Sequence, residues 1–350
     1  MSGILRIGLF IGGLSSEKEI SLESGRHVYN SLDREKYEVL PIFVDNEAHL
    51  WEIEEGLLWK NTTTDLKDAL GSGGSRVYYE DLRNKIDFAF ICLHGKYGED
   101  AFPGLFEILG IPNNGASVLG GALSMDKYRQ RMVLQAAGID TPKYFPIENS
   151  KFQIPNSKIF DEVEAVLSYP VMVKPSREGS STALHKVNNR GELEAALSDA
   201  FIYDKVALVE EVLVGTELTT LVYGEGENIK ALPPSELLRG GDFLTAQEKF
   251  LPGGAQMITP PRLPVEVVEE VKRAAVNTFQ ALSLKVYSRI DSFYVPGRGV
   301  VILEPNNPPA MTPSTALWLE AAEENLNASQ LLDDLIRISL VLHAAKLGPL

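Results

Sequence analysis

The chain has 350 residues, of which 44% are hydrophobic and 23% are charged, a composition ordinary for a soluble globular protein of two or three domains. Its formal net charge of -15, without a basic stripe, argues against a protein that binds nucleic acid. No apolar run reaches the ~18–20 residues that a membrane span needs, so we expect no membrane partner. The N-terminus lacks the features of a secretory signal, and we expect a cytoplasmic protein. The single cysteine, Cys92, lies in an apolar run and is predicted to be a buried thiol rather than a nucleophile.

The first 120 residues are predicted to form an α/β unit with a parallel sheet. The patterns favour strands at 4–13, 37–45 and 86–94, and a helix at 16–32 that a capping box of Ser16 and Glu19 would begin. The intervening stretch 46–83 is predicted to be irregular, with a mobile loop at 71–75.

The rest of the chain mixes short strands and helices, which is typical of α+β domains. We place a small central domain at 121–216, with helices at 125–138 and 191–201 and strands at 170–174, 183–187 and 205–213. Gly138 would stop the first of these helices. A third domain, 217–350, would contain a helix at 264–283, a strand pair around PGRG and a closing helix at 327–346.

The strand pair SRIDSFYV-PGRG-VVILEPNN concentrates polar residues on one face. If Val295 pairs with Val300 across a four-residue turn, Asp291 faces Glu304 and Arg289 faces Asn306, and Phe293 and Ile302 share that face. Two opposed carboxylates repel each other, and a divalent cation would relieve the repulsion. Oxygen ligands from Asp291, Glu304 and Asn306 suit Mg²⁺, with Mn²⁺ as an alternative. The competing interpretation is a solvent-facing strand pair with incidental charges.

A second stretch, VKPSREGSST, suggests a phosphate-binding loop. Lys174 ends an apolar run, and backbone N–H groups and hydroxyls follow it. A cation site on carboxylates implies a polyphosphate, which Lys174 and the loop around Glu178 and Ser181 would bind. The alternative is a surface lysine at the end of a strand.

Six segments together resemble the D-alanine–D-alanine ligases of the ATP-grasp superfamily. They are VKPSREGSS, LHGKYGED, ALSMDK, LVEEVLVGTEL, RID and EPNNPPAMT, and they occur in the family's order from the first strand to about residue 340. The resemblance implies a three-domain ATP-grasp architecture that binds ATP between two antiparallel sheets. It also implies D-alanine and ATP as small-molecule partners and a homodimer.

The resemblance assigns a role to each residue of the nucleotide site. Lys127 and Lys174 would hold the α- and β-phosphates and Lys249 the γ-phosphate, while Glu210 would accept the adenine amino group. The remaining nucleotide contacts would come from Glu178, Ser181, Glu211, Leu213 and Glu217, and the metal ligands would be Asp291, Glu304 and Asn306.

The resemblance also implies the residues that bind the two amino acids. Glu17 would bind the ammonium of the first one, with Ser180 helping to orient it and His94 and Glu99 near by. Arg289 and the backbone at Ala310 would face the oxyanion, and Thr315 would meet the second carboxylate. Glu17 also has a simpler interpretation, because an acid in the first turn of any helix favours the helix dipole.

Three departures from the family pattern bear on activity. Ala183 and Ala310 stand where the family usually has glycine, and alanine resists a positive φ. Phe250 stands where the lid usually carries a tyrosine that would bond with Glu17 and Ser180. In the family, phenylalanine there accompanies ligases that accept D-lactate, although Phe250 could simply pack.

The sequence therefore favours an ATP-dependent D-alanine–D-alanine ligase for peptidoglycan synthesis. One alternative is a ligase with another second substrate: D-lactate, or another D- or L-amino acid. The other is a degenerate relative that binds nucleotide without ligating, which Ala183 and Ala310 at the family's glycine positions suggest.

Overall fold

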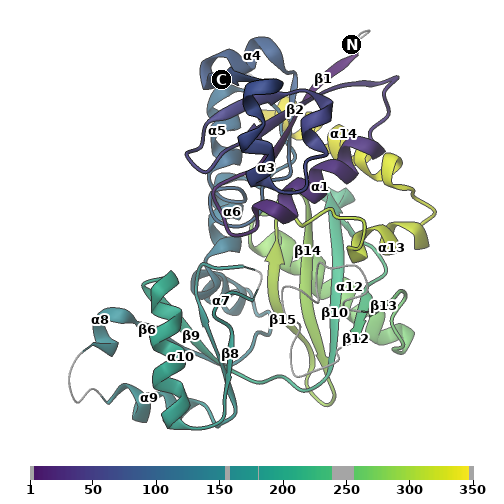
Figure 1. The fold of residues 1–350 in the computed structure, drawn as a ribbon. Coiled ribbons are helices and arrows are strands. Elements are labelled where there is room, and N and C mark those ends of the chain that lie inside the picture. The colour runs from purple at the N-terminus through teal and green to yellow at the C-terminus, as the bar shows by residue number, and fades with distance from the viewer. Residues whose placement is uncertain (1–3, 154–157, 180, 239–255, 347–350) are drawn as a thin grey trace.

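Three sheets organise the protein, as the computed structural model shows (Figure 1). The structure describes residues 4–153, 158–179, 181–238 and 256–346. The N-terminal sheet lies at the top of Figure 1, the central sheet at the lower left, and the C-terminal sheet beside both. No helix in this described part of the chain is both long and apolar enough to cross a membrane.

The N-terminal sheet has five strands in the order β4-β3-β2-β1-β5. Its parallel centre consists of β1 (Leu5–Gly12), β2 (Tyr37–Val44) and β5 (Phe88–Ile91). An antiparallel edge adds β3 (Leu50–Ile53) and β4 (Gly74–Val77). The helices of this part are α1 (Lys18–Ser31), α2 (Glu55–Leu58), α3 (Thr63–Asp68), α4 (Leu82–Lys85) and α5 (Phe102–Leu109). The fully buried centre of β1 matches a parallel strand covered on both faces.

Two sequence-based expectations for this part are wrong. Residues 46–83 are not irregular, because β3, α2, α3, β4 and α4 lie there and 74 and 75 belong to β4 rather than to a mobile loop. The capping box of Ser16 and Glu19 does not form, since α1 begins at Lys18 after Glu17. The Glu19 carboxylate instead accepts hydrogen bonds from the backbone N–H and hydroxyl of Thr63, at the start of α3. A tertiary contact thus replaced a local one.

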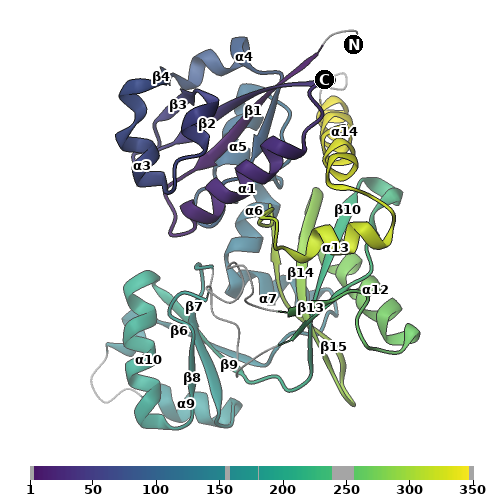
Figure 2. The ribbon, with the colours of Figure 1, turned by 45° about the vertical axis from the view of Figure 1, so that its right-hand side comes forward.

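The central sheet is antiparallel, with four strands in the order β6-β9-β7-β8. They are β6 (Tyr144–Glu148), β9 (Val206–Glu211), β7 (Val171–Pro175) and β8 (His185–Val187). Helices α9 (Ile159–Val166) and α10 (Arg190–Tyr203) bury one face of it, and α8 (Asn149–Phe152) follows β6. Figure 2 shows α10 along this sheet.

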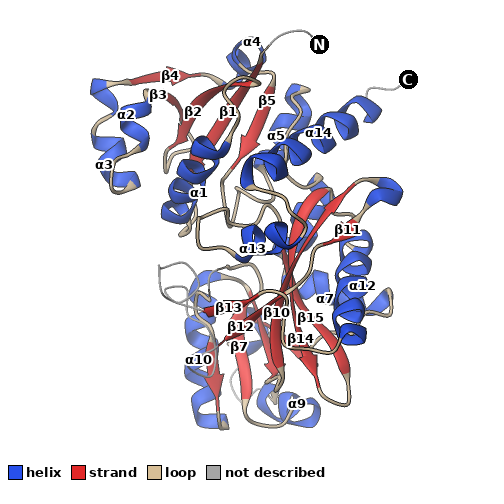
Figure 3. Cartoon of the chain, turned by 90° about the vertical axis from the view of Figure 1, so that its right-hand side faces the viewer, coloured by secondary structure: helices blue, strands red, loops and turns tan. Residues whose placement is uncertain are grey.

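The C-terminal sheet has six strands, five of them in the order β13-β12-β10-β14-β15, with β11 also pairing with β10. Their bounds are β10 (Thr216–Gly224), β11 (Lys230–Ala231), β12 (Ser235–Leu238), β13 (Gln256–Ile258), β14 (Val286–Val295) and β15 (Gly299–Asn306). Helix α12 (Val265–Ala281) packs on one face of this sheet. Helices α13 (Ala316–Glu323) and α14 (Ala328–Lys346) share a core with the other face and with the N-terminal sheet. Figure 3 shows α13 between the two sheets.

Two helices connect the N-terminal and central parts, α6 (Val118–Met125) and α7 (Lys127–Ala136). The expected helix at 125–138 is α7, and Gly138 follows its end with a φ of +73°, as expected of a glycine stop. Asp126 separates the two helices and caps α7 through a hydrogen bond from the Arg129 N–H to its side chain. This cap fixes where Lys127 projects. The proposed domain limits at 120 and 216 stay predictions.

Candidate active site

The hairpin β14–β15 carries the expected acid pair, but with a different turn. Asp291 lies opposite Glu304, and Arg289 lies opposite Asn306, as predicted. At the turn, however, Val295 pairs with Gly299 rather than with Val300, and only residues 296–298 connect the strands.

A β-bulge reconciles these two observations. The register shifts between Asp291 and Ser292, where Leu303 adds one residue to β15. Because of the shift, Ile302 lies opposite Ser292 and packs in the core beneath α12, so its expected place beside Phe293 is wrong. The bulge therefore brings Glu304 opposite Asp291. A regular hairpin with this turn would have placed Leu303 there instead.

Protein cations neutralise the two acids in this structure. The Arg289 guanidinium donates to both oxygens of Asp291, from Nε and from Nη2, at 2.9 Å each. Asp291 also accepts from the Thr219 hydroxyl at 2.8 Å and the Asn306 amide at 3.2 Å. Glu304 forms an ion pair of 3.2 Å with Lys127. The acid pair is thus built into a charged network rather than a solvated strand face.

The donor set of this face fits a hard divalent cation. Asp291, Glu304 and Asn306 supply oxygen atoms from adjacent strands, and oxygen ligands are what Mg²⁺ prefers. Among the described residues, no group of three or more His, Cys, Asp and Glu side chains could hold a metal ion. Binding there would therefore depend on the amide oxygen, on water and on ligand phosphates besides the two acids.

Glu210 on β9 lies at the centre of a second charged group. Its Oε2 lies 2.6 Å from the Lys174 ammonium, and its Oε1 lies 3.0 Å from Nη2 of Arg131. Burial raises the pKa of Glu210, but the charges of Arg131 and Lys174 outweigh this, so the net pKa is lowered and the group is ionised. Burial also lowers the pKa of Lys174, which shares this one carboxylate with Arg131. An anionic ligand would relieve that shortage of negative charge.

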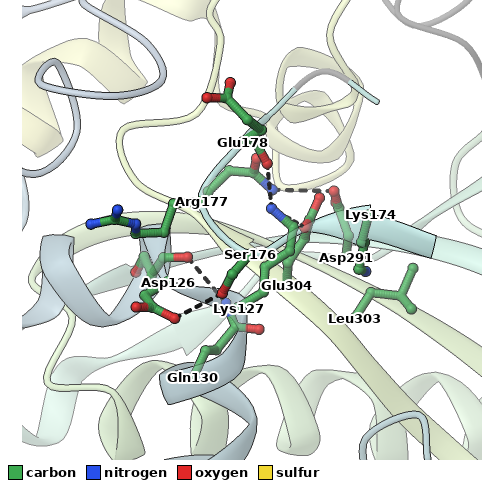
Figure 4. Close-up of polar contacts among 12 residues, drawn as sticks. Asp126, Lys127, Gln130, Lys174, Ser176, Arg177, Glu178, Asp291, Leu303 and Glu304 are labelled. Carbon is green, nitrogen blue, oxygen red and sulfur yellow. Dashed lines mark hydrogen bonds and ion pairs between the residues drawn. The ribbon is translucent and has the colours of Figure 1, made fainter. Parts of the chain in front are cut away.

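Lys127 connects the central loop to the acid face. Its ammonium donates to the Glu178 carbonyl at 2.6 Å while pairing with Glu304 (Figure 4). The Glu178 carboxylate pairs with Lys96, which also donates to the Tyr203 carbonyl. The two sheets of the candidate nucleotide site thus meet through Lys127, and the N-terminal part joins them through Lys96.

The other expected nucleotide residues follow β9. Glu211 accepts from the backbone N–H of Lys143 and from Arg298 at the hairpin turn, at 2.7 Å each. Leu213 is half-buried in the connection to β10, and Glu217 pairs with Phe293 near the start of that strand. Ser181 follows the loop with a φ of +59°. Glu210 and Glu211 thus end β9, and Leu213 follows two residues later. Their contact with adenine stays a prediction.

The residues expected at the first amino acid also converge. Glu17 is buried, and a Cβ added at Gly179 would lie 2.3 Å from its Oε1, so this glycine is needed for the close approach. Glu99 accepts backbone N–H groups of Gly95 at 2.8 Å and Asn307 at 3.1 Å. Burial, with the charge of Glu17, raises the pKa of Glu99 to about 8.

His94 belongs to the same cluster, and its interactions lie within the protein. Its Nε2 lies 3.0 Å from the Ser24 hydroxyl, which also accepts the N–H of Met311. Burial lowers its pKa to about 4, with a smaller contribution from Arg289, although the Pro308 backbone opposes this. The imidazole is therefore neutral at physiological pH.

The comparisons with known proteins identify the family. Residues 6–116 match the family described as D-ala D-ala ligase N-terminus, and residues 133–337 match the one described as D-ala D-ala ligase C-terminus. The chain belongs to the D-alanine–D-alanine ligase family. A D-alanine–D-alanine ligase of Clostridium beijerinckii is 35% identical over 340 residues, 96% of this chain and 99% of that protein.

Two solved members of this ligase family align along nearly the whole chain. The VanG D-Ala:D-Ser ligase from Enterococcus faecalis has a TM-score of 0.85 at 30% identity, and covers 96% of this chain and 100% of its own. The D-alanine–D-alanine ligase from Bacillus anthracis, complexed with ATP, has a TM-score of 0.76 at 29% identity, and the alignment covers 99% of this chain and 100% of that one. The ATP-grasp fold expected from the sequence is thereby confirmed.

The two alanines at family glycine positions differ from each other. Ala183 has a φ of +49°, in the left-handed region that favours glycine. Ala310 is buried and is not one of the seven described non-glycine residues with a positive φ. The expected strain at Ala310 is therefore wrong, whereas the strain at Ala183 is present.

Thr315, which was expected to meet the second carboxylate, precedes α13, and its hydroxyl donates to the Thr312 carbonyl at 2.9 Å.

Three expected residues of the ligase site, Ser180, Lys249 and Phe250, lie outside the described residues. Conversely, the structure adds Arg131 and Lys96, which the sequence analysis missed. Arg131 lies one helical turn after Lys127, so the helix period could have signalled it. Lys96 carried no such signal, because its partner Glu178 is 82 residues away.

Proposed function

We propose that this protein is an ATP-dependent ligase that joins two D-alanine molecules through a D-alanyl phosphate, for the synthesis of a peptidoglycan precursor. The observation that carries the proposal is the charged face formed by Lys127, Lys174, Arg289, Asp291 and Glu304, between the central and C-terminal sheets. Such a face suits the transfer of a phosphoryl group, which depends on positioning and charge neutralisation more than on a nucleophilic side chain.

The reaction would proceed in two steps. A carboxylate oxygen of the first D-alanine attacks the γ-phosphorus, and ADP leaves with the electron pair of the broken P–O bond. The amine of the second D-alanine then attacks the acyl carbon, and the tetrahedral intermediate expels phosphate and loses a proton from nitrogen. Arg289 would stabilise the intermediate oxyanion together with the backbone N–H of Ala310, and Glu17 would hold the first ammonium.

The remaining assignments come from the resemblance to the ligase family. Lys127, Lys174 and Lys249 would bind phosphates, Glu210 the adenine amino group and Glu217 the ribose. Asp291, Glu304 and Asn306 would hold Mg²⁺, which supplies neutralisation of phosphate charge when bound. We further propose a cytoplasmic location, and the homodimer stays a prediction that a solution mass measurement would test.

A different second substrate is the alternative that two observations favour. One is the similarity to a D-Ala:D-Ser ligase, and the other is Phe250 at the lid position. Either D-serine or D-lactate would then replace the second D-alanine. A nucleotide-binding relative without ligase activity is the third candidate, and the retained Arg289, Asp291 and Glu304 argue against it.

One assay separates these candidates. Purified protein, ATP and Mg²⁺ are mixed with D-alanine alone, with D-alanine plus D-lactate or D-serine, and with L-alanine, while ADP release and product mass are measured. We expect D-alanyl-D-alanine. A mixed product in preference to it would reassign the second substrate, and nucleotide binding without turnover on any substrate would favour the non-catalytic relative.

The metal assignment has its own prediction. Asp291→Asn and Glu304→Gln should each lower kcat by about 100-fold or more, because a lost charge-stabilising contact in the transition state costs roughly 3 kcal/mol. Asp161→Asn is the matched control, since the exposed Asp161 on α9 pairs with Arg190 and not with any described residue of the candidate site. A fully active double variant of Asp291 and Glu304 would show that the metal lies elsewhere.

A further inference from the structure

Arg131 is the largest fully buried side chain in the described part of the protein, and no solvent reaches it. Its Nε and Nη2 donate to a single oxygen, Oε1 of Glu210, at 3.1 and 3.0 Å. Its Nη1 donates to the side chain of Gln130 at 2.9 Å and to the carbonyl of Leu303. A buried arginine with all three of these nitrogens bound is held in one orientation.

The two oxygens of Glu210 therefore have different kinds of partner. Oε1 is bound by a guanidinium that has no exposed surface. Oε2 is bound by Lys174 at 2.6 Å, and that side chain is partly exposed. Lys174 is the last residue but one of β7, just before the loop around Glu178, so an anionic ligand there would compete with Glu210 for its ammonium.

We propose that Arg131 is a positioning residue that sets the choice of nucleotide base. It keeps Oε1 of Glu210 bound at all times, whereas Lys174 releases Oε2 when its ammonium turns to a phosphate. Oε2 is then free to accept a hydrogen bond from the base. This inference rests on the proposed nucleotide site, and it adds an exchange of partners within it.

The base that fits is the one that offers a donor. Adenine presents an amino group at its six position, and guanine presents a carbonyl oxygen there. An ionised carboxylate only accepts hydrogen bonds, so guanine would place two acceptors face to face. Arg131 on α7 and Lys174 on β7 keep the Glu210 carboxylate ionised. Tyr144 lies opposite Glu210 on β6. The charges of Lys127 and Glu304 also act on Lys174.

The bond to the Leu303 carbonyl explains why lysine would not replace Arg131 fully. Leu303 is the bulge residue that places Glu304 opposite Asp291. One guanidinium thus contacts both the base acceptor and the bulge, from three nitrogens in a fixed plane. A lysine ammonium at this place could restore the charge but not both contacts.

The test is the binding of ADP and GDP, each with Mg²⁺, measured by calorimetry without the amino-acid substrates. We expect the unmodified protein to bind ADP at least about tenfold more tightly than GDP, because an unpaired buried polar group costs ~1–3 kcal/mol. Arg131→Met should weaken ADP binding by about tenfold or more and reduce the ADP preference by at least about fivefold. Arg131→Lys should retain part of both.

Two further variants keep the test decisive. Arg129→Met is the matched control on the same helix, because Arg129 is exposed and should leave both affinities unchanged. Should Arg131→Met fail to fold, Arg131→Met with Glu210→Gln removes the unpaired carboxylate. This double variant should bind ADP and GDP within about threefold of each other, since an amide can donate or accept.

A folded Arg131→Met protein that keeps the full ADP preference would overturn the inference, and so would a double variant that keeps it. Equal weakening of both nucleotides would indicate a structural role only and would also overturn it. Binding is measured apart from turnover, so a protein that prefers ADP but makes no dipeptide would contradict the ligase proposal and leave this inference standing.

Discussion

Ala183 and Ala310 show at the residue scale how one substitution type has two different consequences. Both replace a glycine that the ligase family usually has. At Ala183 the left-handed backbone costs an L-residue roughly 1–2 kcal/mol. At Ala310 the backbone lies outside that region, and the methyl group is buried. The loop between β7 and β8 therefore carries backbone strain at Ala183 that the segment around Ala310 does not.

Replacing each alanine by glycine should change stability in opposite directions. Ala183→Gly should leave the free energy of unfolding unchanged or raise it by up to about 1 kcal/mol, because relief of strain exceeds the added entropy of the unfolded chain. Ala310→Gly should lower it by about 1 kcal/mol, because only the entropy cost and a lost methyl contact remain. Thermal unfolding of the two variants in parallel checks this. The same sign for both would contradict the assigned backbone conformations.

At the scale of elements, Glu320 fastens α13 to the C-terminal sheet. Its Oε2 accepts the backbone N–H of Leu221 on β10 at 2.6 Å. That N–H faces the gap between β11 and β12, where Pro233 and Pro234 interrupt the pairing of strands. Burial raises the pKa of Glu320 to about 8, although the Leu221 N–H lowers it in part. The carboxyl group is therefore protonated in the folded protein at neutral pH.

This raised pKa predicts a loss of stability as the pH rises through the neutral range. The folded protein keeps a proton that the unfolded chain releases above its ordinary carboxyl pKa, so the free energy of unfolding falls as pH rises from about 4.5 to 8. The contribution of Glu320 is up to about 1.4 kcal/mol per pH unit. Glu320→Gln keeps an acceptor for Leu221 and should unfold at higher denaturant than the unmodified protein at pH 8, but not at pH 5.

The control lies on the same helix. Glu323 is exposed, and Glu323→Gln should leave the pH profile of unfolding unchanged. A Glu320→Gln protein whose stability follows the unmodified protein at every pH would show that Glu320 does not hold the proton.

At the scale of the whole molecule, contacts between distant segments connect the N-terminal sheet to the central one. Lys96 follows β5 of the N-terminal sheet, and Glu178 follows β7 of the central one, yet they form an ion pair. Lys96 also donates to Tyr203 at the end of α10, at 3.2 Å. The side chains are only partly exposed, so solvent screens the pair less than a surface pair.

We expect a double-mutant cycle of Lys96→Met and Glu178→Gln to give a coupling energy of about 0.5–1 kcal/mol in stability, which decreases at high salt. Calorimetry at low and high salt measures it. The matched comparison is Lys272→Met with Glu269→Gln, whose ion pair of 3.1 Å stays within α12. A coupling energy of zero between Lys96 and Glu178 would show that this ion pair does not help to hold the two sheets together.

Several elements were predictable because their signals are local. The apolar runs of β1, β2 and β5, the stop of α7 at Gly138, and the long amphipathic pattern of α12 appear where periodicity and caps place them. Residues 46–83 were not predictable in this way. Their short strands and helices form because β3 and β4 pair at a sheet edge and Glu19 binds α3, which are contacts between segments far apart in sequence.

The sequence by itself determined that Asp291 and Glu304 lie opposite each other on a hairpin, and it predicted which residues would bind phosphates and a metal ion. Those inferences depend on residue type and on alternation along a strand, which are properties of short segments. Only the tertiary structure decided the register, because the bulge at Leu303 is fastened by Arg131 from a helix 172 residues away. It also decided the charge state of Glu210 and the partners of Lys174, since this burial and ion pairing exist only once the central sheet has packed against α7.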